Sequence, residues 1–91
     1  MLMNGNFYNG DWKDDKMHGQ GSLFFSAENY FYKGEFVDGE ISGRGIFFYS
    51  ENQDFYMGEV QKGKYHGKGL YYEREKNKWE LNEYKEGAVH G

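Results

Sequence analysis

The sequence predicts an all-β protein, built as a single-layer, twisted antiparallel meander of stacked β-hairpins with about seven strands. Two features of the composition favour strands: Phe, Tyr and Trp make up 21% of the 91 residues, and there are 14 glycines. Aromatic side chains suit the pleated, half-buried surface of a sheet, whereas glycine destabilises a helix. The third observation is a repeat with a step of 24 residues. A step of this length is typical of stacked supersecondary units.

The repeat is carried by two strings that return together. The first is an aromatic pair followed by a glycine, and its copies span residues 7–12, 31–36, 55–60 and, more weakly, 79–84. The second is Gly-x-Gly, found at residues 19–21, 43–45 and 67–69, with a lone Gly91 at the same step. We therefore expect one array over residues 1–91, with units at 7–30, 31–54 and 55–78 and a partial unit at 79–91.

Each unit is expected to form one hairpin. Residues 7–12 and 19–25 alternate as strands do, and the polar residues 13–18 between them are expected to form the turn. In the next two units, Gly39 and Gly63 share one turn position, which suits a positive φ. Shorter polar turns join the units, at residues 26–29, 50–53 and 74–77.

The turns also suggest a register. If Trp12 pairs with Gly19, then Gly10 pairs with Gly21. Alternation places both pairs on one face, where the paired glycines leave a floor without side chains. We expect an aromatic ring to lie across this floor, from Trp12, Phe36 or a neighbouring tyrosine, because a Cβ at the glycine would push the ring away.

The opposite face carries a second aromatic stripe, which comprises Phe7, Phe24, Phe31, Phe48, Phe55, Tyr72 and Trp79. Across the linking turn, Phe24 is expected to pair with Phe31. Two interpretations are open: the twist and the linking turns shelter this stripe, or the stripe is a docking groove for a partner segment. The seventh strand, around residues 79–85, is expected to be an open edge, where another chain can pair.

The motif Tyr-x-Gly-x-Trp, followed by a polar turn and His-Gly-x-Gly, resembles the MORN repeat (membrane occupation and recognition nexus). The first unit fits this pattern best, and in the second unit Ser42 replaces the histidine. In the fourth copy, Glu80 and Asn82 replace the tyrosine and the glycine. The positions that carry the resemblance are Tyr8, Gly10, Trp12, Gly19, Gly21, Tyr32, Gly34, Phe36, Gly43, Gly45, Tyr56, Gly58, Gly67 and Gly69.

The resemblance implies a rod-like sheet that acts as a non-catalytic scaffold or binding module. MORN proteins occur in cytoskeletal, ciliary, junctional and membrane-apposed assemblies. Some bind a partner helix or extended segment in a groove, others have been linked to phospholipid headgroups, and the repeats also accompany catalytic domains such as lipid kinases and lysine methyltransferases. The expected partners are other protein chains in a larger assembly, with membrane lipid and a second copy of the chain as alternatives.

No catalytic, cofactor or metal site is predicted. Equivalent positions in successive units lie two strands apart, about 9.5 Å, so His18 and His66 would be about 19 Å apart and unable to share one ion. His90, the third histidine, belongs to the partial unit. The four serines lack a recognisable nucleophile elbow or a lysine partner.

The charge and the cysteine content exclude further classes of function and of binding site. A formal charge of −4 argues against nucleic acid as a partner, because phosphate binding needs a basic footprint. Without cysteine the chain has neither disulfides nor thiolate ligands. No apolar run approaches the roughly 20 residues of a membrane span, and no signal peptide is recognisable. We expect a soluble, cytoplasmic chain, not a secreted one, and the resemblance adds the cytoskeleton or the cilium as settings.

Lysines at the hairpin-turn end of the array are the candidate ligands for a phospholipid headgroup: Lys13, Lys16, Lys62, Lys64 and Lys68. Acidic residues occupy the same end, which weakens attraction to a membrane surface. Three functions therefore remain: a scaffold that docks a partner segment on the aromatic groove or the open edge, a phospholipid-binding membrane adaptor, and a regulatory repeat segment of a larger enzyme.

Overall fold

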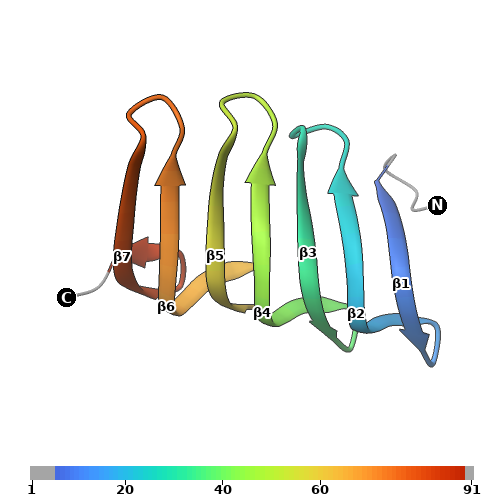
Figure 1. Ribbon diagram of the computed structural model, residues 1–91. Coiled ribbons are helices and arrows are strands. Elements are labelled where there is room, and N and C mark those ends of the chain that lie inside the picture. The colour runs from blue at the N-terminus through green and yellow to red at the C-terminus, as the bar shows by residue number, and fades with distance from the viewer. Residues whose placement is uncertain (1–5, 90–91) are drawn as a thin grey trace.

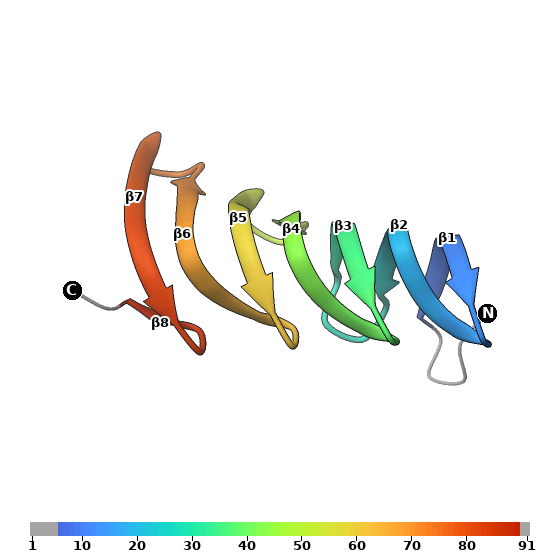
Figure 2. The same ribbon diagram turned by 90° about the horizontal axis from the view of Figure 1, so that it is seen from below.

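The structure is a computed structural model, and it describes residues 6–89. These residues form one open antiparallel sheet in which each strand pairs with the strand that follows it in the chain (Figure 1). No helix occurs in this part of the chain. The slab measures 39 × 26 × 16 Å, and its strands are strongly curved (Figure 2). The predicted fold class, a single-layer meander of hairpins, is confirmed.

Seven strands have seven or more residues, and a short strand of two residues follows them. The strands are β1 (Phe7–Lys13), β2 (Lys16–Phe25), β3 (Tyr30–Val37), β4 (Glu40–Tyr49), β5 (Asp54–Gln61), β6 (Lys64–Glu73), β7 (Lys78–Lys85) and β8 (Ala88–Val89). The linking turns occupy residues 26–29, 50–53 and 74–77, as predicted. The predicted pairing of Phe24 with Phe31 is also confirmed.

The prediction of a six-residue hairpin turn is wrong. Only two residues separate the strands of each hairpin, and both have positive φ: 51° and 65° at Asp14 and Asp15, and 49° and 85° at Asp38 and Gly39. Two-residue turns of this kind match the right-handed twist of the flanking strands. The polar residues on either side of the turn are therefore strand residues. The positive φ predicted for Gly39 and Gly63 is confirmed.

The shorter turn changes the register near it. Gly10 pairs with Gly21 as predicted, but Trp12 pairs with Met17 and not with Gly19. A β-bulge between the two pairs takes up the additional residues of β2, and the same shift recurs in the next two hairpins. The bulge positions Gly19, Gly43 and Gly67 all have positive φ, at 77°, 118° and 70°.

An acidic side chain satisfies the backbone at each bulge. Glu59 Oε2 accepts the N–H of Lys68 at 2.9 Å, and Glu35 and Asp11 make the equivalent bonds in their own hairpins at 3.1 and 3.3 Å. The carboxylate of Glu59 lies against Gly67, so that a Cβ at Gly67 would be only 2.7 Å from Oε2. The acid and the glycine of the repeat are thus two halves of one local structure.

The hydrophobic core lies on one face of the sheet, which we call the tyrosine face after Tyr8, Tyr32 and Tyr56. The ring of each tyrosine covers a glycine on the neighbouring strand, because a Cβ at Gly21, Gly45 or Gly69 would overlap it. The glycine floor is therefore confirmed, with tyrosines as the covering rings. Their hydroxyls donate to backbone carbonyls three residues on, at 2.6, 2.9 and 2.6 Å.

The rings of successive units contact one another along the tyrosine face. The ring of Phe36 meets Tyr8 and Tyr32 edge-on, with centroids 5.1 and 5.2 Å apart. Phe36 is almost completely buried, whereas its counterpart Trp12 in β1 is 55% exposed. The Phe36 ring is therefore buried between the tyrosine of its own unit and the tyrosine of the preceding unit.

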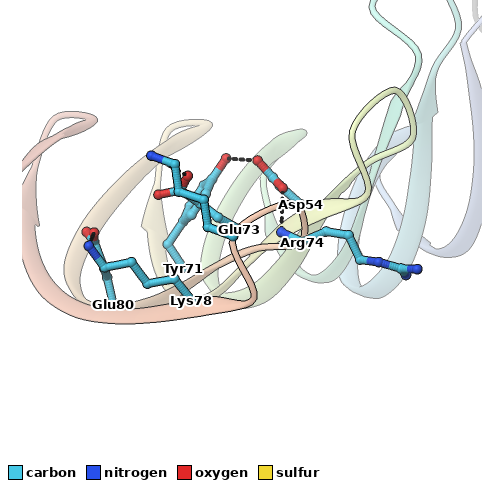
Figure 3. A network of polar contacts seen from close by, with 7 residues as sticks. Asp54, Tyr71, Glu73, Arg74, Lys78 and Glu80 are labelled. Atoms are coloured by element: carbon cyan, nitrogen blue, oxygen red, sulfur yellow. Dashed lines mark hydrogen bonds and ion pairs between the residues drawn. The ribbon is translucent and has the colours of Figure 1, made fainter.

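Backbone hydrogen bonds also connect neighbouring units at both ends of the strands. The N–H of Gly39 donates to the carbonyl of Met17 at 2.8 Å, and Gly63 repeats this contact with Ile41. At the other end, the N–H of Ser50 donates to the carbonyl of Asn29 at 3.2 Å. Beside it, at the end of the β5–β6 hairpin, the carboxylate of Asp54 accepts the N–H of Arg74 at 2.9 Å and the hydroxyl of Tyr71 at 3.4 Å (Figure 3). The array is thus held together by polar contacts as well as by aromatic packing.

The expectation of a fully open edge at the seventh strand is wrong in part. β8 pairs with the end of β7, where Tyr84 faces Val89 and Lys85 faces Ala88. Within residues 6–89, the rest of β7 pairs only with β6. Gly91 and His90 lie outside the described residues.

Candidate partner-binding surface

The predicted aromatic stripe forms a continuous row on the second face of the sheet, which we call the phenylalanine face. Each of its members is paired directly with the next across the strands, from Phe7 in β1 to Trp79 in β7. Neighbouring rings are in contact, with centroids 5.4 Å apart for Phe31 and Phe48 and 4.6 Å for Tyr72 and Trp79.

The stripe is only partly sheltered. Phe7 and Trp79, at its two ends, are 56% and 53% exposed, and the central members are half-buried. The tyrosine face, in contrast, contains the buried core. The exposed apolar side chains within the sheet therefore gather on the phenylalanine face.

A second row runs beside the stripe, and the sequence reasoning missed it. Two residues further along each strand, the paired positions are Asn9, Ser22, Lys33, Ile46, Met57, Leu70 and Leu81. This row is polar in β1 to β3 and apolar from β4 onward, where Met57 is 43% and Leu81 75% exposed. Together the two rows form an apolar band two side chains wide over β4 to β7.

Two adjoining hollows lie in the middle of the phenylalanine face. The first has a volume of about 420 Å³ and is lined by Phe31, Lys33, Ile46, Phe48, Phe55 and Met57. The second has a volume of about 400 Å³, lies over the glycine row, and is lined by Gln20, Lys33, Gly34, Arg44, Gly45, Ile46, Met57 and Gly58. Both are shallow and open to solvent, so the surface suits a side chain of a partner better than an enclosed small molecule.

The titration of the tyrosine face reflects its burial. Desolvation raises the pKa of Tyr32 and of Tyr56 to about 12, although the backbone bond to Glu35 opposes the shift at Tyr32. Burial likewise raises the pKa of Tyr65, whose hydroxyl shares a hydrogen bond with Tyr49. These neutral phenols serve the core, and none of them lines the two hollows.

The histidines occupy separate places. His18 Nδ1 accepts the N–H of Asp38 at 3.4 Å. His66 lines a polar hollow of about 210 Å³ together with Lys62, Lys64 and Glu86. Among the residues that the structure describes, no three His, Cys, Asp or Glu side chains are grouped so that they could hold a metal ion. The same part of the chain contains no helix long and apolar enough to cross a membrane.

Comparison with known proteins agrees with the repeat geometry. The family model of the MORN repeat matches three segments, residues 8–27, 32–53 and 56–72. A search of curated proteins finds no significant match. The matched segments contain the tyrosine, the paired glycines and the bulge glycine of each of the first three hairpins.

Proposed function

Because the chain belongs to the MORN repeat family, a family of non-catalytic interaction repeats, we propose that it is a scaffold module that docks a segment of a partner protein on the phenylalanine face. The docked segment would lie along the apolar band, with β4 to β6 at its centre. The partner would be one chain of a larger assembly. The cysteine-free composition of this protein supports a cytoplasmic location for that assembly.

The observation that carries this proposal is the exposed apolar band. Single exposed apolar side chains are ordinary, but contiguous exposed patches mark interaction sites. Here Phe48 and Phe55 line a hollow whose other residues are apolar except for Lys33. Ile46, Met57 and Leu81 extend the apolar surface along the second row. A side chain seated in such a hollow would gain the dry surroundings that binding hot spots require.

The tyrosine face is the less suitable surface for docking. Its large rings already pack against one another, and Tyr32, Tyr56 and Phe36 have almost no exposed surface. A partner there would meet a completed core. The unpaired part of β7 is a second candidate surface, because an extended segment can add to a sheet edge by backbone hydrogen bonds.

The proposal is tested by photo-crosslinking in the native cell extract. A photoreactive amino acid is placed at position 57, within the band, and at position 61, on the same strand and face but outside it. We expect one discrete crosslinked product from position 57 and none from position 61, and the same product should form when the purified partner is used in place of the extract. We also expect it to be lost in Phe48→Asp.

A second pair of variants separates docking from folding. Met57→Asp places a charge in the band at an exposed site, and Gln61→Asp is its matched control on β5. Both should keep the far-UV circular dichroism of the wild type, while only Met57→Asp should lose the partner. A partner retained by both Phe48→Asp and Met57→Asp would exclude the phenylalanine face as the docking surface.

A further inference from the structure

The two hollows of the phenylalanine face share an unusual charge pattern, since no carboxylate lines either of them. Lys33 lies where they meet and is the single charged residue of the first. Arg44 joins it in the second, above Gly34 and Gly45. A hollow lined mainly by apolar side chains thus adjoins a hollow that contains two cations.

Neither cation has an acidic partner in the structure. Within residues 6–89, ion pairs join only Lys76 to Glu73 and Lys78 to Glu80, so no described carboxylate oxygen lies within 4.0 Å of the Lys33 ammonium or the Arg44 guanidinium. Glu35, two residues from Lys33, instead accepts the backbone N–H of Arg44 at 3.1 Å. Both cations are solvated in the free chain.

A partner that covers the hollows removes this water. A charge that is buried without a partner is strongly destabilising, whereas a close pair of opposite charges across an interface can stabilise binding. The occupant must therefore supply an anion beside its apolar contact. Resting on the function proposed above, we propose that the docked segment presents a large apolar side chain next to an aspartate or glutamate.

The sheet geometry sets the spacing between the two groups. Lys33 is paired directly with Ile46, and Ile46 with Met57, and paired residues have Cβ atoms about 5 Å apart. The apolar side chain fills the hollow between Phe48 and Phe55. The carboxylate, within one or two residues of it in the segment, faces Lys33 and Arg44.

An acidic protein segment fits this surface better than an anionic membrane. Glu35, Glu59 and Glu83 lie on the same face, one row beyond the glycines, and the whole chain has a formal charge of −4. A flat anionic bilayer would meet these carboxylates together with the cations. A narrow segment centred on the second row meets Lys33, whose paired neighbours Ser22 and Ile46 are uncharged, and reaches Arg44, which is paired with Glu59, only at its margin.

The test selects short random peptides that bind the full chain, with Phe48→Asp used to remove peptides that bind elsewhere. Peptides that depend on Phe48 should be enriched in Asp or Glu beside Phe, Leu or Trp. Fluorescence polarisation then measures the affinity of the best synthetic peptide. Lys33→Met and Arg44→Met should each weaken it by about tenfold, and Lys33→Glu should shift the selection toward basic residues.

Lys68→Met is the matched control, because Lys68 lies on the same face but lines neither hollow. It should leave the affinity unchanged. If peptides depend on Phe48 but lack acidic residues, or if Lys33→Met and Arg44→Met bind as the wild type does, the acidic partner is wrong and the docking surface stands. If no peptide depends on Phe48, the docking surface itself is wrong. If phosphatidylserine vesicles bind through Phe48 and Lys33, a lipid replaces the acidic segment.

Discussion

At the scale of single residues, the fold depends on tyrosine rings that lie directly on glycine backbone. The Tyr32 ring occupies the space where a side chain at Gly45 would begin, and the hydroxyl of Tyr32 donates to the carbonyl of Glu35 at 2.9 Å. Each ring is thus fixed from below by a glycine and at its tip by the backbone. The sequence was enough to predict the floor, because the glycines and the aromatics keep the same step of 24 residues.

Gly45→Ala should therefore destabilise the protein by about 1–3 kcal/mol, because the added methyl group displaces the Tyr32 ring from a well-packed site. The measurement is the free energy of unfolding in urea. Gly63→Ala is the control: Gly63 has φ 77° but nothing within 4 Å of the added atom, so it should cost only about 1 kcal/mol of backbone strain. Equal losses in the two variants would contradict the glycine floor.

A double-mutant cycle identifies the ring as the cause. In a Tyr32→Leu background the smaller side chain leaves room for a methyl group at position 45. The additional cost of Gly45→Ala should then be well below its cost in the wild type. A cost that does not depend on residue 32 would assign the effect to the backbone.

At the scale of the hairpin, the sequence predicted the linking turns but not the hairpin turns. Residues 26–29 stand between clear aromatic strands, so polarity alone places that turn. Residues 13–18 are polar too, yet Lys13 and Lys16 to His18 are strand residues whose side chains face solvent or line the rim of the core. The missed signal was the acid that directly follows the first glycine of each unit, since Asp11, Glu35 and Glu59 mark a bulge.

Glu59→Ala should cost about 1 kcal/mol, because it removes a charge-assisted hydrogen bond to the N–H of Lys68 at a partly exposed site. Hydrogen exchange at the Lys68 amide should accelerate. Glu83 is the matched control: it is the equivalent residue of β7 and accepts no backbone N–H among the described residues. If Glu83→Ala is as costly as Glu59→Ala, the carboxylate does not act through the bulge.

The candidate surface was predicted less completely than the fold. The stripe from Phe7 to Trp79 follows from alternation, and its register is as expected. The apolar second row could not be recognised as a stripe, because Asn9, Ser22 and Lys33 interrupt it in the first three strands. The unpaired state of Lys33 and Arg44 depends on side-chain distances, which no pattern of residue types contains.

At the scale of the whole molecule, stability should fall at high pH. Burial raises the pKa of Tyr32 and of Tyr56 to about 12 from about 10 in an unfolded chain, so the folded state favours the neutral phenol. This contribution is present in full below about pH 10 and is lost as the pH rises toward 12. Urea unfolding across this range should show a falling free energy, and the ultraviolet absorbance of tyrosinate should rise together with the loss of circular dichroism.

The removal of one buried phenol gives this experiment its contrast, since Tyr56 has almost no exposed surface. In Tyr56→Phe the decline of stability with pH should be shallower than in the wild type. A stability that stays constant from about pH 10 to 12 would mean that the phenols of the tyrosine face are accessible to water.

The bond from Gly39 to Met17, repeated from Gly63 to Ile41 and from Gly87 to Tyr65, gives the array a nearest-neighbour energetics. Each hairpin contacts only the hairpins before and after it, so the free energy of folding approximates a sum of unit terms and interface terms. A destabilising substitution in β3 or β4 therefore disrupts the interfaces with both neighbouring hairpins, so that the parts of the array on either side unfold independently. A substitution of equal energetic cost in β1, which has one neighbour in the described sheet, unfolds only that end of the sheet. Cooperativity in such a chain is a property of its interfaces, and the position of a substitution matters as much as its chemistry.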